Sequence, residues 1–208
     1  MRHAPCRRDD GAVSISASHE LVAGARAGQA GRVLLLNGTS SSGKSSIAKE
    51  LLATLDGTWF HLAIDQFHRL RARRDWSEEE FLPVFQRTVL GFHRAVAGMA
   101  AAGNDVVVDH ILGERWRLED CLAVFDELPV FFVGVRCSLP ELERRERERG
   151  NRTIGRAAVQ FPLVHEHGLY DVEVDSERHT PAECAGQIRD RLNQDPPTAF
   201  AELRRMPR

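Results

Sequence analysis

The chain has 208 residues, 42% of them hydrophobic and 28% charged, and its formal net charge at pH 7 is −2. These values are typical of a soluble globular domain and exclude the compositions of disordered and collagen-like chains. A net charge this close to zero argues against a protein that mainly binds nucleic acid or an anionic membrane. We therefore expect neither a nucleic-acid partner nor a membrane partner.

Cysteine spacing and apolar runs narrow the class further. Cys6, Cys121, Cys137 and Cys184 lie far apart in the sequence, so the spacing indicates neither a zinc site nor a disulfide framework. No apolar run approaches the roughly 20 residues that span a bilayer, and the first 30 residues lack the apolar stretch of a secretory signal. A cytoplasmic protein is predicted, and the sequence leaves open whether it is a monomer or a homo-oligomer.

The predicted elements alternate strands with helices. Residues 1–31 lack lasting periodicity, which predicts a flexible or weakly helical extension before a domain at 32–194. The domain opens with an apolar run at 33–36, a Gly/Ser loop and a helical pattern at 44–55. Two prolines at 196 and 197 end the pattern and leave 195–208 as a short basic C-terminal tail. Further strands are predicted at 59–64, 106–108, 130–135 and 172–174, and further helices at 77–102, 114–127, 140–149 and 180–192.

This alternation predicts an α/β fold in three layers, with a five-stranded parallel sheet flanked by helices. Several strands are apolar on both faces, as in sheets that helices cover on both sides. Ligands of such sheets bind at the carboxyl ends of the strands. The loop after the first strand, Asp65, Asp109 and the segment after Arg136 should therefore share one edge.

The loop after the first strand has the pattern G-x-x-x-x-G-K-S, and it follows a strand and opens a helix. Its backbone N–H groups and the helix start can bind nucleotide phosphates, while Lys44 reaches the β- and γ-phosphates and Ser45 binds Mg²⁺. The strand before and the helix after favour a phosphate loop over a chance Gly/Ser turn. The sequence lacks the Asn-Lys-x-Asp segment of GTP switches and the length of a motor, so a P-loop kinase that uses ATP is favoured over a switch or an ATPase. The predicted nucleotide-binding residues are Gly38, Thr39, Ser40, Ser41, Ser42, Gly43, Lys44, Ser45 and Ser46.

Two carboxylates end the next strands. Asp65 is a candidate general base, because an acid at that place can accept the proton of an attacking hydroxyl; the alternative is a helix N-cap. Asp109 follows three valines as an acid follows apolar residues in Walker-B segments, and it is a candidate for holding Mg²⁺; the alternative is a strand-end turn residue.

Arginines crowd the segment 141–156, interleaved with glutamates. One interpretation is a solvated helix with i,i+4 ion pairs. The other is a lid, in which Gly150 and Gly155 would let the segment close over the nucleotide and bring guanidinium groups to the transferred phosphoryl group. We favour Arg145 and Arg149 as catalytic residues and Arg152 as a nucleotide-binding residue.

Taken together, these segments resemble the chloramphenicol phosphotransferase-like kinases, which are relatives of shikimate and adenylate kinases. The resemblance implies an adenylate-kinase-like fold, Mg-ATP as phosphoryl donor, a hydroxyl acceptor and Asp65 as general base. Inactivation of an antibiotic is that family's best-known activity. The resemblance covers about 32–192 and is carried by LNGTSSSGKS at 36–45, ID at 64–65, VGVRC at 133–137, VH at 164–165 and YDVEVD at 170–175.

The segment after Asp65 departs from the chloramphenicol-modifying pattern because it is shorter and basic. Such residues could select an acceptor with a phosphate or carboxylate group, or they could form a solvated helix. We therefore predict an ATP-dependent O-phosphotransferase acting on a small hydroxyl acceptor, for instance an antibiotic such as chloramphenicol. The alternatives are a nucleotide or small-metabolite kinase of primary metabolism and an ATP-binding regulatory protein. The basic residues are His68, Arg69, Arg71, Arg73 and Arg74.

Overall fold

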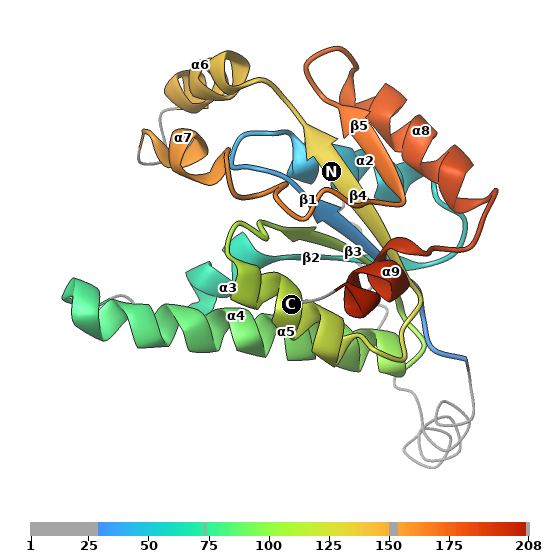
Figure 1. The fold of residues 1–208 in the computed structure, drawn as a ribbon, viewed down its shortest axis with the longest axis horizontal. Coiled ribbons are helices and arrows are strands. Elements are labelled where there is room, and N and C mark those ends of the chain that lie inside the picture. The colour runs from blue at the N-terminus through green and yellow to red at the C-terminus, as the bar shows by residue number, and fades with distance from the viewer. Residues whose placement is uncertain (1–28, 73, 150–153, 207–208) are drawn as a thin grey trace, which may run out of the picture.

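The structure is a computed structural model that describes residues 29–72, 74–149 and 154–206. Most of the expected extension at 1–31 lies outside these residues, and so do Arg73 and Arg152. The described chain forms three layers, with a central sheet between two groups of helices (Figure 1).

The sheet has five strands in the order β2-β3-β1-β4-β5, and every neighbouring pair is parallel. This confirms the predicted α/β fold. Side chains of β1 alternate between the two faces, so that one core contains Val33 and Leu35 and the other contains Leu34 and Leu36, all fully buried. The strands are β1 (Val33–Asn37), β2 (Trp59–Ala63), β3 (Asp105–His110), β4 (Val130–Arg136) and β5 (Val172–Asp175).

Helices cover both faces of the sheet. Figure 1 shows α2 and α8 on one face and α4, α5 and α9 on the other, while α6 and α7 stand beyond the end of β4. None of the helices in the described residues is long and apolar enough to cross a membrane. The helices are α2 (Lys44–Thr54), α3 (Ile64–Leu70), α4 (Glu78–Ala101), α5 (Arg115–Val124), α6 (Leu139–Arg149), α7 (Arg156–Gln160), α8 (Pro181–Leu192) and α9 (Ala199–Arg205).

The start of α4 follows from its sequence. Ser77 Oγ accepts a hydrogen bond from the Glu80 backbone N–H at 3.2 Å, and the Glu80 carboxylate accepts one from the Ser77 N–H at 3.0 Å. This is the capping box that a Ser-x-x-Glu spacing indicates, and such a cap stabilises a helix by about 1 kcal/mol.

The C-terminal segment differs from the expected tail because it contains α9. Phe200 and Leu203 insert into the core under β4, and each is less than one-tenth exposed. The Asp171 carboxylate accepts hydrogen bonds from the backbone N–H groups of Thr198 and Ala199, and Arg204 donates to backbone carbonyls at the end of α5. The helix therefore belongs to the packed domain.

Candidate active site

The phosphate loop joins β1 to α2 and encloses the Lys44 ammonium group. Lys44 is 6% exposed, and its Nζ donates to the carbonyls of Gly38 and Thr39 at 2.9 and 2.7 Å. The loop therefore holds a positive charge at the end of β1 and beside the N-terminus of α2. A helix N-terminus with a lysine of this kind attracts phosphate groups.

Two positions of the phosphate loop, Gly38 and Gly43, require glycine. A Cβ atom on Gly38 would lie 2.7 Å from the Val135 carbonyl oxygen, so a side chain there would push β1 and β4 apart. Gly43 has φ 89°, a left-handed conformation that favours glycine, and it is the N-cap of α2. Gly38 thus permits the close approach to β4, and Gly43 permits the turn into α2.

Ser45 and Asp109 meet across the sheet edge. Ser45 Oγ donates to the Asp109 carboxylate at 2.5 Å, and Lys44 Nζ lies 3.9 Å from the other carboxylate oxygen. The structure thus brings together the hydroxyl and the carboxylate that the sequence nominated separately for Mg²⁺. Hydroxyl and carboxylate oxygens are the donor types that this cation prefers, so the pair fits it chemically.

Asp65 lines a small cavity next to the phosphate loop. It occupies the first turn of α3, whose N-cap is Ala63, so Asp65 is not the N-cap that the alternative interpretation required. A small cavity of about 20 Å³ between α3 and the loop is lined by Asp65, Lys44, Asp109 and Arg149, among others. The volume suffices for about one water molecule. Two carboxylates and two cationic side chains thus meet at the carboxyl end of the sheet.

The arginines of α6 divide into two groups. Arg145 donates to Glu141 at 2.7 Å and to the Ser176 carbonyl at 2.7 Å, which orients it toward the segment after β5. Arg149 lines both the small cavity and a second cavity of about 400 Å³, which Arg145 also lines. In contrast, Arg144 bonds Glu141 and Glu148 on the outer surface, as in the solvated-helix interpretation. Hydrogen bonds from Arg144, and then from Arg145, lower the pKa of Glu141 to about 2.

Two supporting residues escaped the sequence analysis. Gln160 of α7 accepts a hydrogen bond from the Ser40 backbone N–H at 2.8 Å, which joins α7 to the phosphate loop. Asn37, at the end of β1, donates to the Val164 carbonyl at 2.7 Å and to the Tyr170 hydroxyl at 2.8 Å, and it accepts from the Leu112 N–H at 2.8 Å. Asn37 therefore ties three segments together directly before the loop, and its place beside Gly38 was the only available signal.

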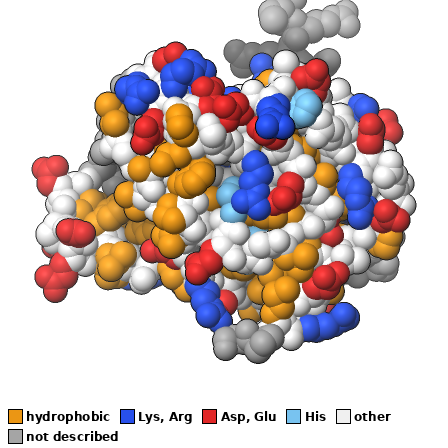
Figure 2. Space-filling view, turned by 45° about the horizontal axis from the view of Figure 1, so that its top comes forward, with side chains coloured by type: hydrophobic (Ala, Val, Ile, Leu, Met, Phe, Trp, Pro, Cys, Tyr) orange, Lys and Arg blue, Asp and Glu red, His pale blue; other side chains and the backbone are white. Residues whose placement is uncertain are grey.

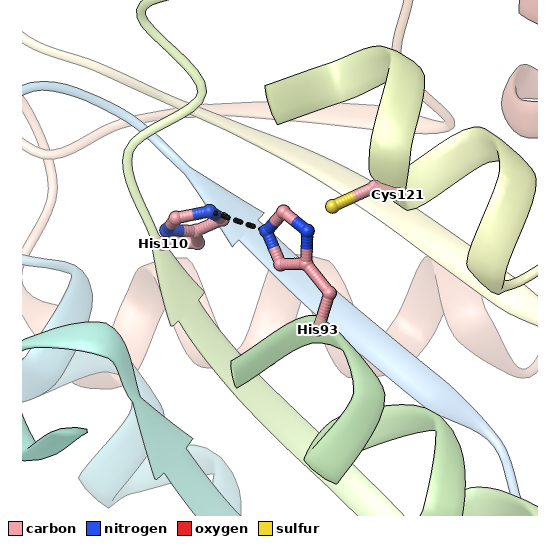
Figure 3. Close-up of side chains that lie close together, drawn as sticks. All are labelled: His93, His110 and Cys121. Carbon is pink, nitrogen blue, oxygen red and sulfur yellow. Dashed lines mark hydrogen bonds between the residues drawn. The ribbon is translucent and has the colours of Figure 1, made fainter. Parts of the chain in front are cut away.

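A buried chain of polar side chains lies behind the site, between β3, α4 and α5. His93 Nδ1 lies 2.6 Å from the Asp120 carboxylate. The other ring nitrogen of His93, Nε2, lies 2.9 Å from His110 Nε2 (Figure 3). The Cys121 sulfur is close by, and one ligand atom from each of His93, His110 and Cys121 lies within 4.8 Å of the others. Burial raises the pKa of the Cys121 thiol well above its ordinary value, which favours the neutral thiol. Hydrogen bonds account for three of the four imidazole nitrogens, so we assign this cluster no metal.

Comparison with known proteins agrees with this geometry. Residues 31–193 match the family described as chloramphenicol phosphotransferase-like protein. The chain belongs to this family. A curated Mycobacterium tuberculosis relative, strain H37Rv, named "Putative O-phosphotransferase Rv2636", is 29% identical over 199 residues, covering 84% of this chain and 88% of the relative.

Solved structures share the fold. The M. tuberculosis APS kinase CysC in complex with AMPPNP and APS aligns with a TM-score of 0.63 at 20% identity, over 80% of this chain and 100% of that one. The Deinococcus radiodurans tunicamycin resistance protein aligns with a TM-score of 0.60 at 17% identity, over 80% and 98%. The family match and the curated relative make the chain a phosphotransferase, and the solved structures show that it has the fold of the P-loop kinases.

Proposed function

We propose that this chloramphenicol phosphotransferase-like protein transfers the γ-phosphoryl group of ATP to a hydroxyl group of a small molecule. The observation that carries the proposal is the cavity at which Asp65 meets Lys44, Ser45 and Asp109. A protein that only binds nucleotide has no use for a carboxylate at the place where an acceptor hydroxyl would approach the γ-phosphate.

In this proposal the donor lies along the phosphate loop. Residues 38–46 bind the phosphates through backbone N–H groups and the Lys44 ammonium, and Ser45 and Asp109 hold Mg²⁺, which would neutralise charge on the phosphates. The cavity of about 400 Å³ between α6 and the segment 176–181 is large enough for the nucleoside part of ATP. Arg152 remains a candidate for nucleotide binding.

The acceptor hydroxyl would approach Asp65. Its proton passes to the Asp65 carboxylate, its oxygen forms a bond to the γ-phosphorus, and the bond from that phosphorus to the β–γ bridging oxygen breaks, which releases ADP. Arg145 and Arg149 would stabilise the charge that spreads over the transferred group. An antibiotic hydroxyl such as that of chloramphenicol is the acceptor that the family name suggests, and use of ATP fits the expectation of a cytoplasmic protein.

The test is ADP release from Mg-ATP against a panel of acceptors. The panel holds chloramphenicol, other hydroxylated antibiotics, hydroxy acids, sugars and nucleoside monophosphates, and mass spectrometry follows each acceptor. We expect at least one acceptor to stimulate ADP release and to gain the mass of one phosphate. ADP release that no acceptor changes, with nucleotide binding intact, would instead favour an ATPase or an ATP-binding regulatory protein.

A further inference from the structure

Buried nitrogen atoms without a hydrogen-bond partner gather around His68, one helical turn after Asp65. In the described part of the chain, seven buried side-chain polar atoms lack a partner, and four of them are nitrogens of His68, Arg71, His110 and Arg117. His68 lies near the C-terminal end of α3 and Arg71 is its C-cap, while His110 ends β3 and Arg117 lies in the first turn of α5. A buried polar group without a partner costs about 1–3 kcal/mol, so such a concentration at one place indicates a missing ligand.

Aromatic rings hold these side chains in place. The Arg71 guanidinium lies over the Phe81 ring at 5.0 Å, and the Arg117 guanidinium lies over the Phe85 ring at the same distance. The His68 ring stacks on Phe85 with centroids 5.0 Å apart. Cation–π contacts fix the planes of both guanidinium groups, which reduces the entropy lost when they bind a ligand.

Both arginines are partly bonded already. Arg71 Nε donates to the His68 carbonyl at 3.3 Å, which leaves Nη1 buried and unpartnered. Arg117 donates to the Ile111 carbonyl and pairs with Glu114 at 2.5 Å, which leaves Nε unpartnered at a side chain only 14% exposed. Ile111 also lines the small cavity with Asp65, so Arg117 lies next to the candidate transfer site.

The electrostatic environment of this cluster is positive. Burial is the largest cause that lowers the pKa of His68 to about 4; Arg71, Arg117 and Arg156 act in the same direction and Asp65 acts in the opposite one. At neutral pH His68 is therefore uncharged among arginines. The three arginines that act on His68 outnumber the two carboxylates, Asp65 and Glu114, so a bound anion would balance the charge of the cluster.

His110 offers a different bond. The ionised Asp120 carboxylate, which also pairs with Arg94, accepts a hydrogen bond from His93 Nδ1–H, so the unprotonated His93 Nε2 accepts one from His110 Nε2–H. The tautomer that follows from this network leaves a lone pair on the unpartnered His110 Nδ1. This atom can accept a hydrogen bond but cannot donate one to an anion. The arginines are therefore the residues that would bind the anion.

We propose that the acceptor carries an anionic group, namely a carboxylate, sulfate or phosphate, that Arg71 and Arg117 bind while its hydroxyl faces Asp65. The proposal rests on the proposed function, since it describes the acceptor half of the same site. Asp65 and His68 are three residues apart on α3, so their Cβ atoms lie about 5–6 Å apart and a small molecule can span both. Figure 2 shows hydrophobic side chains gathered on the left of this face, on the side where α4 begins, and exposed Leu70, Phe81 and Leu82 of α3 and α4 would contact the rest of such an acceptor.

Sulfate tests the site independently of catalysis. The protein is first saturated with Mg²⁺ and a non-hydrolysable ATP analogue, so that sulfate cannot occupy the phosphate loop, and calorimetry then measures sulfate binding. We expect Arg71→Met and Arg117→Met each to weaken sulfate binding about ten-fold or more, because each removes a charged hydrogen-bond donor. The matched exposed arginines provide controls, and Arg69→Met and Arg115→Met should change the affinity by less than about two-fold. Sulfate binding that is absent, or equal in all four variants and therefore adventitious, would overturn the proposal.

A second experiment uses matched pairs of acceptors to test whether transfer requires the anionic group. Each pair has one scaffold with and without the anion: a hydroxy acid and its amide, a sugar phosphate and its sugar, a nucleoside monophosphate and its nucleoside. We expect phosphoryl transfer to the charged member, with the acceptor KM raised about ten-fold or more in Arg71→Met and Arg117→Met and the KM for ATP unchanged. Equal transfer to the neutral members would overturn the inference that the acceptor is anionic, whereas the proposed phosphotransferase function would stand. Transfer to no member would count against the proposed function, and the sulfate result would still decide the inference.

Discussion

The donor half and the acceptor half of the candidate site are built in different ways. In the donor half, Lys44, Ser45 and Asp109 bond one another or the backbone of the loop. In the acceptor half, Arg71 and Arg117 lie against aromatic rings with buried nitrogens that lack partners. The first half comes from one short segment and one strand end, whereas the second needs side chains from α3, α4 and α5. In the proposed function, phosphate binding is therefore local in the sequence, whereas acceptor selection depends on the tertiary fold.

Among the variants of the donor half, Lys44→Ala should have the largest effect. Lys44→Ala removes the charge at the β- and γ-phosphates, and we expect turnover to fall by roughly 10²–10³-fold, with weaker ATP binding. Lys49→Ala, an exposed lysine on the same helix, is the control and should keep wild-type turnover. Steady-state kinetics and nucleotide titration measure both effects. Unchanged ATP affinity in Lys44→Ala would contradict the role given to the loop.

Asp109→Asn should have a smaller effect on the same half. The change weakens the acceptor of the Ser45 hydrogen bond, and we expect the Mg²⁺ concentration for half-maximal rate to rise by roughly 10–100-fold. Asp105→Asn is a matched control, because Asp105 begins the same strand and pairs with Arg32 far from the loop. An identical Mg²⁺ dependence in both variants would remove Asp109 from the metal site.

Acidification should lower the stability of the fold, because several histidines around the acceptor half and under β1 and β4 have lowered pKa values. Burial is the largest cause that lowers the pKa of six histidines, with His68 and His167 at about 4 and His165 at about 3. Below pH 6.5 the unfolded chain takes up protons that the folded chain does not, so the free energy of unfolding falls as the pH decreases from about 6.5 to about 4.

Thermal unfolding between pH 4 and pH 7.5 measures this loss, and we expect the Tm to fall by roughly 5 °C or more below pH 6.5. His68→Gln removes one of these groups and should flatten the profile, whereas the exposed His179→Gln should leave it unchanged. A Tm that rises on acidification across this window would contradict the account.

The fold was largely predictable because each element carries a local signal. The apolar runs gave all five strands, and the Ser77 and Glu80 spacing gave the start of α4. The sequence carries no periodic signal for α7, and the segment that forms α9 was predicted as a tail, because each helix has fewer than eight residues and too few turns to establish a periodicity. The apolar residues of α9 are recognisable only once β4 and α5 are in place to receive them.

The two halves of the site differ in the same way. Lys44, Ser45, Asp65 and Asp109 could be nominated because strand ends of a parallel sheet converge on one edge. Arg117 could not, since a Glu114–Arg117 pair at i,i+3 has the sequence pattern of a solvated helix surface. Its contact with Phe85, and the neighbourhood of His68, arise only from the packing of α3, α4 and α5.

The central claim is that Asp65 serves the acceptor and not the nucleotide. The most direct measurement compares acceptor-dependent ADP release and ATP-analogue binding in the wild type, Asp65→Asn and the exposed control Asp75→Asn. We expect Asp65→Asn to lose about 10²–10⁴-fold in transfer rate, as for a lost general base, while its affinity for the analogue stays within about two-fold of the wild type. Full transfer activity in Asp65→Asn, or a loss of nucleotide affinity that matches the loss of rate, would contradict this division of the site.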